Sequence, residues 1–162
     1  VLPFRPRAAG CLVTALWRPE EVAAENACLR VGPGSHKGPL HSLFEGEVFT
    51  GRMAPDVTAD MKAKDVPVVG KAGSVCFMHT RLAHGSEASR SDRPRGLYIC
   101  VYSAADAVPI AQNPMPNLNE GRIVRGRKSR KARLSPALVE LPEQPKSASF
   151  FTVQGQASAA GD

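Results

Sequence analysis

The chain has 162 residues and a formal net charge of +6, with 43% hydrophobic and 22% charged residues, a composition typical of ordinary globular proteins. Its length suits one domain or a large part of one, and no apolar run approaches the roughly 18 residues that a membrane-spanning helix needs. The first six residues lack the layout of a secretion signal, and the absence of an initiator Met predicts that Val1 is a cut or processed end.

Five segments predict β-strands because they are rich in β-branched and apolar residues and are bounded by turn residues. They are residues 12–17, 28–31, 66–69, 74–78 and 97–102. Residues 55–64 predict a short helix with Asp56 near its start. No repeat and no sustained helical periodicity is present. The fold class is therefore mainly β, with antiparallel strands joined by loops and a few short helices.

Four cysteines lie far apart, and each is in or beside an apolar run: Cys11, Cys28, Cys76 and Cys100. No CxxC metal clip and no dense disulfide framework is present. Free cysteine behaves as a small apolar residue, so we expect buried free thiols. A reducing compartment follows, either the cytoplasm or the interior of an organelle.

The composition changes after the predicted body of the domain, residues 1–120. The segment 121–143 is basic, with seven Lys and Arg between Arg122 and Arg133 and no acidic residue among them. One interpretation is a solvated surface or flexible tail, and the other is a nucleic-acid or targeting patch. We expect no nucleic-acid partner, because no aromatic residue is interleaved and no reading motif is present. Residues 144–162 are small and polar, and predict a poorly ordered tail with Phe150-Phe151 as an anchor.

The most informative segment is GSVCFMHTRLAHGSEASRSDRPRGLYICVY at 73–102, in which an apolar strand leads to His79 and His84, and Arg95 follows. A lone His near a strand end is more often structural than a ligand. The order FMH, TRLA, HGS and RSDRPR, however, resembles the distal ligand motif of the phytanoyl-CoA dioxygenase family. Upstream, ENACLRVGPGSHKGPLHSL resembles the family's ENGCL and PGSHKG segment, and LVTALW with EEV resembles the preceding strand.

This resemblance covers residues 1 to about 109 and implies a double-stranded β-helix, a jelly-roll or cupin-like barrel that is incomplete at its N-terminus. In this family Fe(II) is held by two His and one carboxylate, which leaves positions open for cosubstrate and oxygen. The opening PFRP resembles sequence just past the family's HxD motif. We therefore expect two iron ligands to lie just before Val1, so that this chain is a truncated piece; a gene product that has lost activity is the alternative.

The resemblance assigns residues to the cofactor site. His84 matches the distal iron ligand, and Arg95 matches the arginine that pairs with the far carboxylate of 2-oxoglutarate, for which a planar guanidinium is well suited. Arg93 is the rival for that role. Ser86 is a candidate donor to the same carboxylate, against a plain turn residue.

The sequence also suggests roles for four further residues. Thr14 either faces the cosubstrate or is a half-buried strand residue. His79 is expected to orient a ligand or to close a polar network through hydrogen bonds, rather than to bind iron. His36 either lines the barrel mouth or is exposed, after a turn in which Ser35 bonds locally. Ala27 stands where the family usually has Gly, so the turn before Cys28 is expected to be shaped differently.

The implied function is that of a 2-oxoglutarate-dependent dioxygenase, which hydroxylates an unactivated C–H bond of a small molecule and releases succinate and CO2. Fe(II), 2-oxoglutarate and O2 are the expected cofactors, and ascorbate is a candidate addition. The isolated chain is expected to be inactive because the HxD ligands are missing. The alternatives are a metal-free barrel that binds carboxylates through Arg95 and, if the carboxylate ligand is replaced by a small residue, a halogenase. Substrate and oligomeric state do not follow from the sequence.

Overall fold

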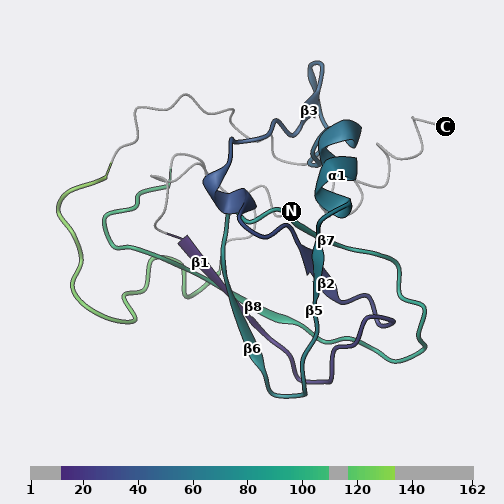
Figure 1. The fold of residues 1–162 in the computed structure, drawn as a ribbon. Helices are drawn as coiled ribbons and strands as arrows, with labels where there is room; N and C mark the ends of the chain where they lie inside the picture. Colours follow the sequence, from purple (N-terminus) through teal and green to yellow (C-terminus); the bar gives the residue numbers. More distant parts are fainter. Residues whose placement is uncertain (1–11, 110–116, 134–162) are drawn as a thin grey trace. The chain divides into compact units, whose positions relative to one another are not determined.

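The computed structural model describes residues 12–109 and 117–133 (Figure 1). The chain divides into two compact units. The first, here called the sheet unit, comprises residues 12–39 and 55–103. The second, the loop unit, contributes residues 40–54, 104–109 and 117–133 to the described part. Cys11 and the predicted tail 144–162, with its Phe150-Phe151 pair, lie outside the described residues.

One three-stranded antiparallel sheet of the sheet unit has β1 (Leu12–Trp17) at its centre, between β6 (Val75–His79) and β8 (Tyr98–Ser103). Figure 1 shows these three strands side by side. Strand alternation puts Leu12, Thr14 and Leu16 on one face, where all three are buried. Met78 lies opposite Thr14 and is also buried, so this face forms the core of the sheet.

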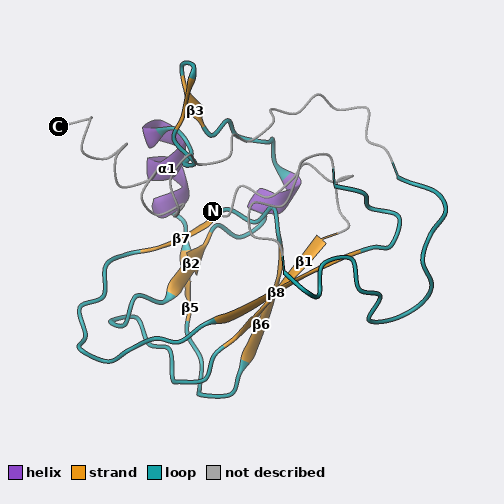
Figure 2. Cartoon of the chain, turned by 180° about the vertical axis from the view of Figure 1, so that it is seen from behind, coloured by secondary structure: helices purple, strands orange, loops and turns teal. Residues whose placement is uncertain are grey.

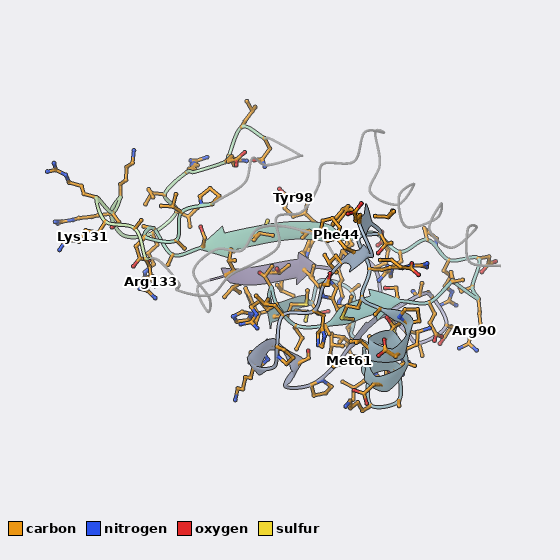
Figure 3. All side chains as sticks on the ribbon, turned by 90° about the horizontal axis from the view of Figure 1, so that it is seen from above. Phe44, Met61, Arg90, Tyr98, Lys131 and Arg133 are labelled. Carbon is orange, nitrogen blue, oxygen red and sulfur yellow. The ribbon has the colours of Figure 1, made fainter. Side chains whose placement is uncertain are left out.

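The other three-stranded antiparallel sheet has the order β5 (Val66–Val68), β2 (Leu29–Val31) and β7 (His84–Ser86). Along the chain, β1 lies in the first sheet, β2 and β5 in the second, β6 in the first, β7 in the second and β8 in the first. The helix α1 (Pro55–Lys62) and the short 3-10 helix η1 (Ser35–Lys37) lie in the connection between β2 and β5, as the cartoon in Figure 2 shows. Met61 of α1, labelled in Figure 3, approaches Gly32, where an added Cβ would lie 3.2 Å from its sulfur.

All five predicted strands and the predicted helix are confirmed, with small errors at their ends. The strand predicted at 28–31 starts at Leu29, and those predicted at 66–69, 74–78 and 97–102 are Val66–Val68, Val75–His79 and Tyr98–Ser103. The helix ends at Lys62 rather than residue 64. Strand β7 was not predicted, because the run His-Gly-Ser is too short and too rich in glycine to indicate a strand.

The second face of the β6-β1-β8 sheet is apolar and exposed. It carries a row of large side chains from all three strands: Val13, Trp17, Val75, Phe77, Tyr98 and Tyr102. Phe77 is 70% exposed, and Tyr98, labelled in Figure 3, is 60% exposed. Strand β8 is also open on its first face, where Val101 is 48% exposed. Among the described strands β8 pairs with β1 alone, so its outer edge is unpaired.

The loop unit contains a small hairpin that the sequence analysis did not predict. Strands β3 (Phe44–Glu45) and β4 (Val48–Phe49) pair through a turn with Gly46 at φ 60°, and the two Phe rings meet edge to face with centroids 5.2 Å apart. Glu45-Gly46-Glu47 between two apolar residues was the available signal. Further along, the segment 117–133 is a series of turns without helix or strand.

Three cysteines fall within the described residues, and all three are free thiols as predicted. Cys28 is buried, whereas Cys76 and Cys100 are only partly buried, so the expected burial holds in full for the first alone. None of the helices in residues 12–109 and 117–133 has the length and hydrophobicity needed to cross a lipid bilayer.

Candidate functional site

His84 begins strand β7, where it lies opposite Val31 of β2, and Ser86 projects from the same face two residues on. The Nδ1–H of His84 donates a hydrogen bond to the carbonyl oxygen of Leu82 at 2.6 Å. The partly buried ring has a pKa below its ordinary value, because burial disfavours the imidazolium. The ring is therefore neutral, with an unprotonated Nε2 that accepts no hydrogen bond from any described residue.

The turn between β6 and β7 fixes the start of β7 through main-chain bonds. The N–H of Leu82 donates to the carbonyl oxygen of His79 at 2.9 Å, and the N–H of Gly32 donates to the carbonyl oxygen of Ala83 at 2.9 Å. The N–H of Ala83 donates to the hydroxyl of Ser35 at 2.8 Å. Ser35 was expected to bond locally; this bond reaches 48 residues along the chain and ties η1 to the residue preceding His84.

His79, at the end of β6, stacks on His36 of η1, with ring centroids 5.2 Å apart and an interplanar angle of 29°. Its Nδ1 accepts a hydrogen bond from the N–H of Arg81 at 3.0 Å. Burial lowers the pKa of His79, and the nearby His36 and Arg81 lower it further. No contact between His79 and His84 is present, so the predicted role of His79 in orienting a ligand stays a prediction. His36 is partly buried rather than exposed.

Arg81 completes this group, and the sequence analysis did not single it out. Its Nη2 donates to the carbonyl oxygen of Gly38 at 2.8 Å, which holds the end of η1. Two buried nitrogens, Nε of Arg81 and Nδ1 of His36, have no hydrogen-bond partner among the residues that the structure describes. No sequence signal could have found this group, because the turn after β6 brings Arg81 to residues more than 40 positions earlier.

Thr14 is buried on the core face of β1, and its hydroxyl lies 2.9 Å from the hydroxyl of Thr80. This bond satisfies one hydrogen-bonding capacity of Thr14 inside the apolar core. A contact between Thr14 and the cosubstrate stays a prediction.

The two candidate arginines differ in their surroundings. Arg93 is exposed, and its N–H donates to the hydroxyl of Ser91 at 3.0 Å. Arg95 is partly buried in the segment that leads into β8, and its guanidinium has no partner among the described residues. The next N–H, that of Gly96, donates to Oε2 of Glu20 at 2.8 Å. A Cβ on Gly96 would lie 2.7 Å from that oxygen, so the carboxylate of Glu20 would have to move to admit a side chain there.

Metal binding would need further ligands beyond His84. Within residues 12–109 and 117–133 no group of three or more His, Cys, Asp and Glu side chains is arranged to hold a metal ion. The described residues therefore offer His84 as a candidate imidazole ligand, and the additional ligands would lie outside them.

Comparison with known proteins gives a consistent result. The family model "Phytanoyl-CoA dioxygenase (PhyH)" matches residues 1–97. Peroxisomal phytanoyl-CoA dioxygenase of Rattus norvegicus is 34% identical over 107 residues, which are 64% of this chain and 31% of that protein. The chain thus spans about a third of the length of the curated relatives it matches.

Two solved structures share the fold. EctD from S. alaskensis with 2-oxoglutarate and 5-hydroxyectoine is 25% identical, with a TM-score of 0.52 over 60% of this chain and 33% of that one. The epimerase SnoN in complex with Fe3+, alpha ketoglutarate and nogalamycin RO is 25% identical, with a TM-score of 0.54 over 82% of this chain and 51% of that one. The predicted class, a mainly β cupin-like fold with antiparallel sheets, is confirmed.

Proposed function

Because the chain belongs to the phytanoyl-CoA dioxygenase family, we propose that it serves in an Fe(II)- and 2-oxoglutarate-dependent oxygenase. The reaction is the hydroxylation of a small molecule, coupled to conversion of 2-oxoglutarate and O2 into succinate and CO2. Two similar structures hold these groups: EctD contains 2-oxoglutarate, and SnoN contains Fe3+ and alpha ketoglutarate. Their substrates differ, and the substrate of this protein is left open.

The observation that carries the proposal is the state of the His84 ring. A metal-binding His typically donates its second ring N–H to a carbonyl or carboxylate, which fixes the tautomer and the orientation of the ring. His84 does this through Nδ1–H to Leu82, and the lone pair on Nε2 is available. The lowered pKa keeps the ring neutral, as a ligand must be. The residue therefore fits the role of an iron ligand.

Within this proposal the chain's own residues bind and orient. His84 would hold the metal, and the guanidinium of Arg95 would pair with the far carboxylate of 2-oxoglutarate. Ser86, on the same strand face as His84, donates its hydroxyl to that carboxylate. The iron, when bound, supplies the activation of O2 that oxidises a C–H bond. The remaining iron ligands come from outside the described residues.

A metal-free module that binds carboxylates is the second candidate. It is favoured by one observation: the described residues contain no group of three metal-ligating side chains. In this case Arg95 would bind a carboxylate with no contribution from a metal ion.

The experiment that separates these functions uses the 162-residue chain itself. Mn(II) is titrated into the protein, and the imidazole NMR signals of its four His residues are followed. If His84 is an iron ligand, its signals broaden first, and 2-oxoglutarate increases this broadening in the native chain but not in Arg95→Ala. His84→Gln should abolish this selective broadening, and His41→Gln, at a residue of the loop unit, is its matched control. A response to 2-oxoglutarate without any effect of Mn(II) would favour the metal-free module, and broadening of another His before His84 would contradict the role of His84 as a ligand.

A further inference from the structure

The loop unit carries a concentrated positive charge that the proposed function does not use. Residues 117–133, here called the basic loop, contain seven Lys and Arg between Arg122 and Arg133. Six of them are exposed and have no acidic partner among the described residues: Arg122, Arg125, Arg127, Lys128, Arg130 and Lys131. Figure 3 shows the side chain of Lys131 extending away from the ribbon. The loop is thus a strong local attractor for anions.

The seventh basic residue, Arg133, has a structural task. Its Nη2 donates to Oδ2 of Asp106 at 2.8 Å, and its main-chain N–H donates to the carbonyl oxygen of Asp106 at 2.7 Å. This double contact anchors the end of the basic loop to the segment that follows β8. The other six cations are left available to a partner.

Local hydrogen bonds give the basic loop a defined course. The side chain of Asn117 accepts the N–H of Asn119 at 2.9 Å, and the hydroxyl of Ser129 accepts the N–H of Lys131 at 3.0 Å. Gly121 and Gly126 take left-handed turns at φ 75° and 85°. Both are turn conformations that glycine adopts without strain. The cations are therefore displayed by a folded loop.

Aliphatic side chains accompany this charge. Leu118 is fully exposed, Val124 is 71% exposed and Ile123 is 43% exposed. A loop that is charged only to remain soluble does not need neighbouring exposed aliphatic residues. Positive charge interleaved with exposed aliphatic side chains is the combination that suits the interface of an anionic bilayer, where charge attracts the loop and apolar groups enter the headgroup region.

We propose that the basic loop binds the surface of an anionic phospholipid bilayer, with Ile123 and Val124 entering the interface. Nucleic acid is the less suitable partner, because the basic loop has no aromatic residue to stack on bases and its aliphatic residues would have no use there. This inference does not depend on the proposed oxygenase function.

The test uses the full chain and sedimentation with vesicles of phosphatidylcholine, with or without phosphatidylserine. We expect salt-sensitive binding only when phosphatidylserine is present. The triple variant Arg125→Gln, Arg127→Gln, Lys128→Gln should bind about a hundredfold more weakly, since each cation contributes about a fivefold gain near an anionic surface. The matched control is Lys37→Gln, Lys62→Gln, Lys71→Gln, which removes the same charge from exposed positions of the sheet unit and should bind like the native chain. Equal losses in the two triple variants would reduce the effect to net charge and overturn the proposal.

A second variant tests the aliphatic part. Ile123→Ser with Val124→Ser should weaken vesicle binding about tenfold and leave the salt dependence unchanged, because no charge is removed. Unchanged affinity in this variant would overturn the insertion of these side chains. Tighter binding of the native chain to an RNA or DNA oligonucleotide than to phosphatidylserine vesicles at the same salt concentration would overturn the membrane assignment.

Discussion

The imidazole rings of His36 and His79 stack with their centroids 5.2 Å apart and at an angle of 29°, and so join η1 to the end of β6. A second constraint acts on His79. Its Nδ1 accepts the N–H of Arg81, so protonation at that atom would set two N–H groups against each other. Both the burial and the surroundings of the ring therefore favour its neutral form.

This arrangement predicts that the protein loses stability on acidification. An unfolded His takes up a proton near pH 6.5, while His79 in the folded protein does so at lower pH because its pKa is lowered, first by burial and then by His36 and Arg81. Below about pH 6.5 the unfolded chain therefore binds more protons than the folded protein does. The free energy of unfolding consequently decreases as the pH is lowered. Urea unfolding at about pH 7.5 and pH 5.5 measures this fall.

The replacement His79→Phe should reduce the same pH dependence, because it keeps an aromatic ring for the stack but cannot take up a proton. The dependence that remains would include His84, whose pKa is also lowered by burial. An undiminished dependence in His79→Phe would assign the effect to other groups.

Replacing Ala27 by glycine should stabilise the protein. Ala27 is the one residue other than glycine among those described that has a positive φ, 59°, so the chain keeps at Ala27 a backbone conformation that favours glycine. Left-handed backbone costs a residue with a Cβ about 1 kcal/mol. Ala27→Gly should raise the free energy of unfolding by up to about 1 kcal/mol. Ala24→Gly, in the same turn, should lower it by about 0.5–1 kcal/mol, and the opposite order in a urea titration would contradict the strain.

Replacing Ser35 by alanine should loosen the chain locally at the start of β7. Ser35→Ala removes the acceptor of the Ala83 N–H, a bond of 2.8 Å, and should cost about 1 kcal/mol. Amide exchange at Ala83 and His84 should become about fivefold faster, while exchange in β1 should change much less. Ser42→Ala is the control, since the hydroxyl of Ser42 caps the N–H of Phe44 in the loop unit. Uniform acceleration throughout the chain would show that Ser35 acts on global stability.

Replacing Arg95 should lower the affinity for 2-oxoglutarate in a form of the protein that carries the complete iron site. Loss of a hydrogen-bonded charge pair costs on the order of 2–5 kcal/mol, so Arg95→Ala should weaken 2-oxoglutarate binding by roughly thirtyfold to several thousandfold. Because the side chain is only partly buried, the lower end of that range is expected. Arg93→Ala, at an exposed residue, should cost less than about 1 kcal/mol. A 2-oxoglutarate titration under anaerobic conditions compares the two, and the reverse order would move the role to Arg93.

The sequence predicted the strands whose apolar runs are long enough to show their period, such as Leu12–Trp17 and Tyr98–Ser103. It did not predict β7, whose three residues pair with β2 because the β6–β7 turn delivers them there. The same turn explains why Arg81 was missed, since its contact with Gly38 joins residues 43 positions apart in the chain. The candidate ligands were found through a motif, while the bond from His84 to Leu82 needed coordinates.

Strand β8 has a consequence for handling the protein. Its six residues, Tyr-Ile-Cys-Val-Tyr-Ser, include no charge and no proline, and among the described strands one of its edges is unpaired. Such an edge offers main-chain donors and acceptors to any further strand, including β8 of another molecule, and has none of the features that block this addition. Folded molecules should therefore associate as the protein concentration rises, even under conditions in which none of them is unfolded. Light scattering over a dilution series would detect this association.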